Sequence, residues 1–321
     1  MIVLTGGAGF IGSGFLSKLN QKGITDVLVV DHLGQSQKWK NLVGKDYSYF
    51  VNKNTFSLNL SAGVYNPKDI DCIIHMGACT LTTEVDADYV MDNNLNYSME
   101  IAQFAYLNKI RFIYASSAAT YGNGENGYSD DVYDDLKPLN IYGYSKHQFD
   151  KWVLANKYDN YFTGLKFFNV FGPNEYHKSD MASMVYKSYH QIKETGMVRL
   201  FKSNHTDYKD GEQMRDFIYV KDVVDVIWKI FEDKDISGIF NLGTGLARTW
   251  NDLALSVFMA LDKKPNIEYI EMPENLKKQY QNFTQADMNK LLDVVNIDFS
   301  SLEDSISDYV INYLENDWQY L

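Results

Sequence analysis

Near its start the chain reads IVLTGGAGFIG (residues 2–12), a short apolar run that leads directly into a cluster of glycines. Gly6, Gly9 and Gly12 follow the spacing G-x-x-G-x-x-G at the predicted start of a helix. A backbone without Cβ atoms lets a pyrophosphate approach closely, and the helix N-terminus adds N–H donors and a favourable dipole. A second apolar run ends at Asp31, where a carboxylate commonly meets an adenosine ribose. This order of strand, glycines, helix and acid predicts a dinucleotide-binding site.

The choice between NAD and NADP depends on the side chains around Asp31. A lone acid disfavours a 2′-phosphate, but Lys38 follows closely, and Lys53 follows a candidate third strand at residues 49–51. Lysines there can neutralise a phosphate monoester through charge-assisted hydrogen bonds. They can equally be solvated surface lysines, so these residues alone leave both cofactors open.

Short apolar runs alternate with segments of helical spacing along the first half of the chain. The runs lie at residues 2–4, 27–30, 72–74, 112–115 and 165–168, and the helical segments include residues 11–21, 89–107 and 142–156. Apolar runs without polar alternation suit parallel strands that are covered on both faces. The pattern predicts an α/β fold: a Rossmann doubly wound parallel sheet with a smaller, interleaved α/β substrate-binding region.

The pattern changes after Asn169, where a turn and a polar stretch lead into another predicted helix. Residues 216–220 and 239–243 look like strands that return to the first sheet, with a helix at 222–231 between them. We therefore predict a cofactor-binding domain of residues 1–170 plus about 216–243. The predicted substrate-binding domain comprises the remainder, about 171–215 plus 244–321, and it includes a polar surface loop at residues 205–213.

Composition narrows the classes of protein and partner. Thirty Lys plus Arg against 42 Asp plus Glu give a formal net charge of −12, which argues against general attraction to nucleic acid or anionic lipid. Two cysteines, Cys72 and Cys79, are too few for a disulfide framework. We see no basic leader segment and no apolar run long enough to cross a bilayer. We expect a soluble cytoplasmic protein with small-molecule ligands, no nucleic-acid or membrane partner and no metal site.

Tyr142 and Lys146 form a Tyr-x-x-x-Lys pair, and this i to i+4 spacing places both side chains on one face of a helix. A neighbouring ammonium and a positively charged nicotinamide ring stabilise the phenolate of a tyrosine, whose pKa is otherwise about 10. Such a tyrosine can take a proton from an alcohol as hydride leaves its carbon. Ser117 follows the predicted strand at 112–115, at the sheet edge where ligands bind, and we assign it as the hydroxyl donor to the reacting oxygen.

Together with residues 116–122 and 168–173, these motifs resemble the extended short-chain dehydrogenase/reductase superfamily. More narrowly, the chain resembles the ADP-L-glycero-D-manno-heptose 6-epimerase family along nearly its whole length. The narrower resemblance rests on residues 91–94, 177–178, 181–183, 239–245 and 282–287. It implies NADP as cofactor, an ADP-sugar as substrate, and inversion at C6 of a heptose that supplies the lipopolysaccharide inner core. It also implies a homopentamer.

The resemblance further implies roles for individual residues. One base on one face cannot serve both epimers, and the position of the family's second acid/base matches Lys178. The cofactor-binding positions are Gly6, Gly9, Phe10, Ile11, Gly12, Asp31, His32, Lys38, Lys53, Met76, Gly77, Ala78, Cys79, Thr80, Asn93, Lys146, Val170 and Lys178. The substrate-binding positions are Asn169, Asp180, Lys187, Phe201, Lys202, Ser203, Asn204, Arg215 and Tyr280. Among these, the Arg215 guanidinium is the expected bidentate clamp on the substrate pyrophosphate.

Three positions depart from the family pattern: His32 stands for an Asn, Met76 for a Glu and Asp180 for a Ser. Another sugar-nucleotide 4-epimerase is an alternative on the cofactor half alone, but it leaves residues 177–178 and 283–287 without a role. A 4,6-dehydratase generally needs an acidic pair just after the serine, which the chain lacks. A non-catalytic NADP-binding regulator typically loses the tyrosine or the lysine, and this chain has both.

Overall fold

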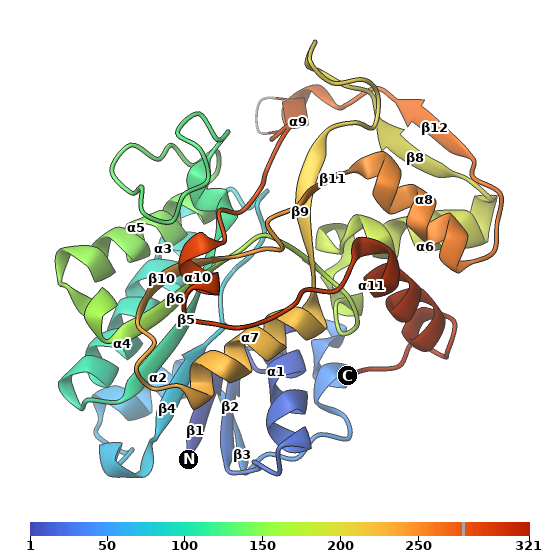
Figure 1. Cartoon of the computed structure of the whole chain (residues 1–321). Helices are drawn as coiled ribbons and strands as arrows, with labels where there is room; N and C mark the ends of the chain where they lie inside the picture. Colours follow the sequence, from blue (N-terminus) through green and yellow to red (C-terminus); the bar gives the residue numbers. More distant parts are fainter. Residues whose placement is uncertain (278–279) are drawn as a thin grey trace.

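The computed structural model describes residues 1–277 and 280–321, and its centre is a seven-stranded parallel sheet (Figure 1). The strand order is β10-β6-β5-β4-β1-β2-β3, so the order reverses between β1 and β4. The bounds are β1 (Ile2–Thr5), β2 (Val27–Asp31), β3 (Tyr49–Asn52), β4 (Cys72–His75), β5 (Arg111–Ser117), β6 (Phe162–Phe167) and β10 (Gly238–Leu242). Ligands of open α/β sheets bind at such a reversal. The predicted doubly wound α/β fold is confirmed.

Helices cover both faces of the main sheet (Figure 1). The helices of the described residues, including those of the smaller region, are α1 (Phe10–Gln21), α2 (Lys53–Ser61), α3 (Ala87–Met91), α4 (Tyr97–Leu107), α5 (Ile141–Ala155), α6 (Met184–Thr195), α7 (Val220–Glu232), α8 (Trp250–Ala260), α9 (Glu274–Lys277), α10 (Asn289–Leu292) and α11 (Leu302–Tyr309). The side chains of successive strand residues point to opposite faces of the sheet, and each face has its own hydrophobic core. Leu4 and Ile74 pack in the core that contains α1 and α7, and Val3 and Ile73 pack in the core that contains α2, α4 and α5. Burial on both faces explains the uninterrupted apolar runs.

Two smaller sheets lie beyond the carboxyl ends of the main strands (Figure 1). The first contains β7 (Asn169–Phe171), β9 (Met214–Tyr219) and β11 (Ala247–Thr249), and the second pairs β8 (Val198–Phe201) with β12 (Ile267–Ile270). The prediction that residues 216–220 return to the main sheet is wrong. β6 ends at Phe167, and β7, which begins at Asn169, lies outside the main sheet and pairs in parallel with β9. The prediction for residues 239–243 is confirmed, because β10 pairs with β6.

The helix predicted over residues 89–107 is interrupted by a π turn at residues 92–96, between α3 and α4. The side chain of Asn94 in this turn accepts a hydrogen bond from the Cys79 N–H and donates to the Cys79 carbonyl, at 2.7 and 2.9 Å. It also donates to Ser145 Oγ on α5 at 3.0 Å. The wider turn therefore ties the loop after β4 to α5. The described ranges contain no helix that is both long and apolar enough to span a membrane.

Candidate active site

The loop between β1 and α1 is shaped so that a ligand can approach its backbone. Gly6 has a φ of +67°, and a Cβ there would lie 2.5 Å from the Gly77 nitrogen. A Cβ on Gly12 would lie 2.2 Å from the Gly6 carbonyl oxygen. Gly9 is the N-cap of α1 and supplies no side-chain cap, so the first N–H groups of the helix stay available. The glycines thus let the loop pack closely against its own backbone and Gly77, and the uncapped helix start fits the pyrophosphate of a dinucleotide.

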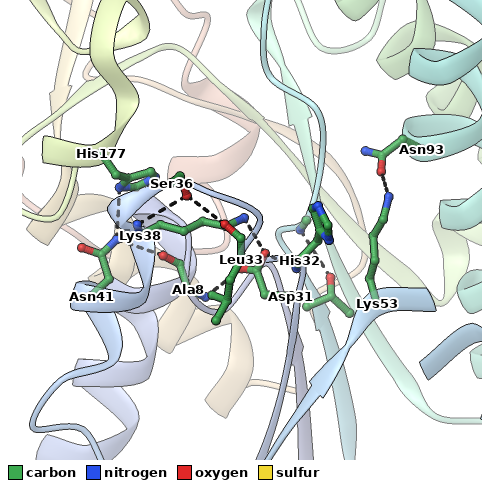
Figure 2. A network of polar contacts seen from close by, with 12 residues as sticks. Ala8, Asp31, His32, Leu33, Ser36, Lys38, Asn41, Lys53, Asn93 and His177 are labelled. Atoms are coloured by element: carbon green, nitrogen blue, oxygen red, sulfur yellow. Dashed lines mark hydrogen bonds and ion pairs between the residues drawn. The ribbon is translucent and has the colours of Figure 1, made fainter. Parts of the chain in front are cut away.

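The predicted adenosine-end residues meet in one cavity of about 100 Å³. The Asp31 carboxylate accepts the Ala8 N–H at 2.9 Å, and it also accepts the His32 N–H and the Lys38 ammonium, each at 2.7 Å. Figure 2 shows Lys38 held in this way while Lys53 bonds to Asn93. Burial lowers the pKa of Lys53. Both predicted lysines are therefore in place, and each already has a partner within the protein.

A second cavity, of about 340 Å³, brings the predicted catalytic residues together. Ser117 at the end of β5 and both Tyr142 and Lys146 on α5 line it. The Lys146 ammonium donates to the Ala115 carbonyl at 2.9 Å. Burial lowers the pKa of Lys146 to about 8, and burial raises the pKa of Tyr142 although a hydrogen bond with Ser117 opposes that rise. Tyr142 thus needs further positive charge beside it before it can act as a base near neutral pH.

Lys178 lines the same cavity from the turn at residues 176–181, with its ammonium 5.2 Å from the centre of the Phe10 ring. Burial lowers the pKa of Lys178, and the nearby Glu175 carboxylate partly opposes this. Glu175 is fully buried and accepts hydrogen bonds from Gly172 and Ser183, which brace the segment that carries Lys178. A lysine with a lowered pKa can exchange a proton near neutral pH.

Further predicted residues line the adenosine-end cavity and the catalytic cavity. The catalytic cavity is also lined by the predicted residues Phe10, Ile11, Met76, Ala78, Thr80, Asn169 and Val170. The adenosine-end cavity contains the predicted residues Gly6, Asp31, His32, Lys38, Lys53, Gly77, Ala78, Cys79 and Asn93. Asn169 donates to Thr284 Oγ1 at 3.3 Å, so the motif at residues 282–287 reaches the catalytic cavity. Because Ala78 lines both cavities, they adjoin.

A third cavity, of about 740 Å³, shares Lys178 and Met181 with the catalytic one. The predicted substrate residues on its lining are Asp180, Lys187, Phe201 and Tyr280. Arg215 lies behind this lining, with its guanidinium 5.5 Å from the Trp250 ring and 5.0 Å from the Tyr280 ring. Burial lowers the pKa of Arg215, which is 6% exposed. Within residues 1–277 and 280–321 no carboxylate lies within 4 Å of this guanidinium, so none forms an ion pair with it there.

Four predicted substrate residues do not line the described part of these cavities: Lys202, Ser203, Asn204 and Arg215. The Lys202 ammonium bonds to the Glu271 carboxylate at 2.7 Å, the Ser203 hydroxyl donates within its own loop, and Asn204 is exposed. The sequence reasoning missed Trp250 and Tyr97. Trp250 donates its indole N–H to the Tyr280 hydroxyl at 2.8 Å, and the buried Tyr97 hydroxyl in the adenosine-end cavity has no partner among the described residues. Neither residue belongs to a sequence motif, because each is brought to its cavity by contacts between segments that are distant in the chain.

Comparison with known proteins agrees with this geometry. A family model, the NAD dependent epimerase/dehydratase family, matches residues 2–243. The chain is 53% identical over 317 residues to the ADP-L-glycero-D-manno-heptose-6-epimerase of Nitratidesulfovibrio vulgaris (strain Hildenborough), with 98% of each covered. It is 48% identical over 333 residues to the protein of the same name from Fusobacterium nucleatum, with 100% of each covered. The solved Helicobacter pylori ADP-L-glycero-D-manno-heptose-6-epimerase matches with a TM-score of 0.82 at 30% identity, over 97% of this chain and 95% of that one.

Proposed function

The chain belongs to the NAD dependent epimerase/dehydratase family, and from that premise we propose that it is an ADP-heptose 6-epimerase. It inverts C6 of the heptose in ADP-D-glycero-β-D-manno-heptose and yields the L-glycero epimer. The names of the relatives above support this substrate. The observation that carries the proposal is the position of Lys178, which lines both the cavity of Tyr142 and the larger cavity beside Arg215. Two proton-transfer groups thus meet where an anionic sugar nucleotide can enter.

Inversion at C6 requires a proton-transfer group for each epimer, and Tyr142 and Lys178 can provide one each. A bound nicotinamide cofactor supplies hydride acceptance at C6 and hydride return to the opposite face. Tyr142 takes the proton of the C6 hydroxyl in one half-reaction, while the Lys146 ammonium stabilises its phenolate and Ser117 donates a hydrogen bond to the reacting oxygen. Lys178 transfers the proton of the C6 hydroxyl in the half-reaction of the other epimer. Arg215 holds the substrate diphosphate, which keeps the sugar in the cavity while its C6 end turns.

Within this family assignment we propose NADP as the cofactor. His32, Lys38 and Lys53 share one cavity with Asp31, and two ammonium groups there favour a 2′-phosphate. In the described structure Lys38 neutralises Asp31, which reduces the repulsion that a lone carboxylate would exert on that phosphate. In this proposal residues 1–170 with about 216–243 bind the cofactor, and the remaining segments bind the sugar nucleotide.

We also propose that the protein works in the cytoplasm as a homopentamer and supplies heptose for the lipopolysaccharide inner core. The family resemblance motivates the assembly. Sedimentation of the purified protein tests it directly, because a monomeric or dimeric mass at working concentration contradicts a pentamer.

The activity is tested by incubating the NADP-loaded protein with ADP-D-glycero-β-D-manno-heptose and following both epimers by proton NMR. We expect an approach to the same epimer ratio from either side. Tyr142→Phe is the matched control, since it removes only the phenol oxygen, and we expect it to abolish most turnover while the cofactor stays bound. No conversion of the ADP-heptose, with turnover of a UDP-hexose instead, would overturn the assignment.

A further inference from the structure

A buried ion pair lies directly behind the catalytic residues and takes no part in the mechanism above. The Lys166 ammonium on β6 is 3.3 Å from the Asp150 carboxylate on α5, and both side chains are 0% exposed. Burying two charges costs solvation free energy, and a buried pair is often no more stable than apolar residues of the same size. Stability alone is therefore a weak reason for this pair.

Neutral donors, acceptors and rings complete the coordination of both charges. Asp150 accepts hydrogen bonds from the Tyr114 hydroxyl at 3.1 Å and from the Ser116 hydroxyl at 2.7 Å. Lys166 donates to Thr120 Oγ1 at 3.0 Å, and its ammonium is 4.6 Å from the centre of the Tyr121 ring. The two hydroxyl donors and the Lys166 ammonium therefore hold the Asp150 carboxylate in one position on the buried side of α5.

The position of this charge relative to the catalytic pair follows from helix geometry. Tyr142, Lys146 and Asp150 are successive i to i+4 positions on α5, so they share one face. Lys146 donates to the Ala115 carbonyl, and the next residue, Ser116, donates to Asp150. The catalytic lysine therefore has the tyrosine one turn before it and the carboxylate one turn after it.

Other titratable groups near Lys146 do not replace this carboxylate. Burial and the Lys146 charge lower the pKa of His75 on β4 to about 3, so this ring is neutral, and it bonds to Thr5 and Ser98. Burial raises the pKa of Tyr114 and of Tyr142, so neither hydroxyl supplies a negative charge near neutral pH. In residues 1–277 and 280–321, Asp150 is the one carboxylate whose charge acts on Lys146.

We propose that Asp150 is a positioning residue of the catalytic centre: its carboxylate, held in place by Lys166, stabilises the Lys146 ammonium one helix turn away on α5. Burial by itself lowers the pKa of Lys146, and the Asp150 charge opposes this. Without Asp150 the pKa of Lys146 falls further, so a smaller fraction of Lys146 is protonated at neutral pH. The phenolate of Tyr142 then loses its stabilising charge, and the rate falls on the alkaline side of the pH profile. Only this consequence for the rate rests on the proposed function.

The test measures the titration of Lys146 directly. Protein labelled with ¹³C at the lysine ε carbon is titrated by NMR, and the Lys146 signal is assigned by its loss in Lys146→Met. Asp150→Asn should lower the titration midpoint by roughly one to three pH units, because a unit charge one helix turn away is removed. Since Asp150→Asn leaves Lys166 buried without a carboxylate, Asp150→Asn combined with Lys166→Met provides a second variant that lacks the whole buried ion pair, and it should also show a downward shift.

Tyr114→Phe is the matched control, because it removes one hydrogen bond to Asp150 but no charge. It should leave the Lys146 midpoint unchanged. An unchanged midpoint in both Asp150 variants, or an equal downward shift in Tyr114→Phe, overturns the proposal. The alkaline limb of kcat/KM on the ADP-heptose should move with the NMR midpoint. If wild-type protein does not turn that substrate over, the proposed function fails, while the titration still decides the role of Asp150.

Discussion

The cations at the two ends of the active-site cleft differ in what holds them. At the adenosine end, Lys38 is paired with Asp31 and Lys53 with Asn93. At the substrate end, Arg215 and Lys178 are buried or half-buried, and in the described ranges neither has a carboxylate within 4 Å. In a chain of net charge −12, an unpaired buried cation is the stronger sign of an anionic ligand. The comparison predicts that substitutions of the unpaired cations have larger effects than substitutions of the paired ones.

The largest effect is expected from Lys178→Met. It removes the second proton-transfer group and should lower kcat by about a thousandfold, the usual range for a general acid or base. The loss should be larger for one epimer than for the other in single-turnover reduction or oxidation of bound cofactor, followed at 340 nm. Lys193→Met is the control: Lys193 lies on α6 and forms an exposed ion pair with Glu315, so its substitution should leave both rates unchanged. Equal losses for the two epimers contradict a two-base mechanism.

Arg215→Met should raise KM for the ADP-sugar by about a hundredfold, because a desolvated guanidinium no longer meets the diphosphate. Arg215→Lys keeps the charge but lacks the planar fork, so it should recover only part of this loss. Arg199→Met is the control: Arg199 lines the cavity in front of Arg215, but it is exposed and paired with Glu268. Steady-state kinetics with NADP-loaded protein measure KM for the three variants. A larger effect of Arg199→Met than of Arg215→Met would reverse our assignment of the anion clamp.

These residues also show how far the sequence could predict the site. The glycine loop, Tyr142 and Lys146 were predictable because helix and strand periodicity fixes their relative positions within a few residues of chain. Trp250 was not, since its contact with Arg215 depends on the pairing of β9 with β11, which no local pattern encodes. The same holds for β9 itself: its apolar pattern suits either sheet, and its pairing with β7 and β11 places it in the smaller one. Long-range pairing, not local propensity, limited the prediction.

At the adenosine end, Lys38→Met should weaken NADP binding by only about fivefold, because Lys38 must leave Asp31 before it can meet a 2′-phosphate. Binding of NAD, which lacks that phosphate, should change less. Titration calorimetry on cofactor-free protein measures both affinities, and Lys40→Met on the exposed end of the same turn is the control. An equal loss for NAD and NADP would mean that Lys38 only supports the fold around Asp31.

The smallest effect is expected from Lys202→Met, although the family resemblance assigns Lys202 to the substrate. Its ammonium is paired with Glu271 at 2.7 Å, and the side chain is 45% exposed, so water and a carboxylate already satisfy it. A screened surface charge contributes little to a buried ligand, and kcat/KM should stay within about twofold of wild type. Glu271→Gln, which frees Lys202 from its partner, separates the two explanations. If Lys202 reaches the substrate when it is unpaired, Glu271→Gln lowers KM. A tenfold loss of kcat/KM in Lys202→Met would place a paired, exposed cation among the anion-binding groups, which contradicts the comparison between paired and unpaired cations.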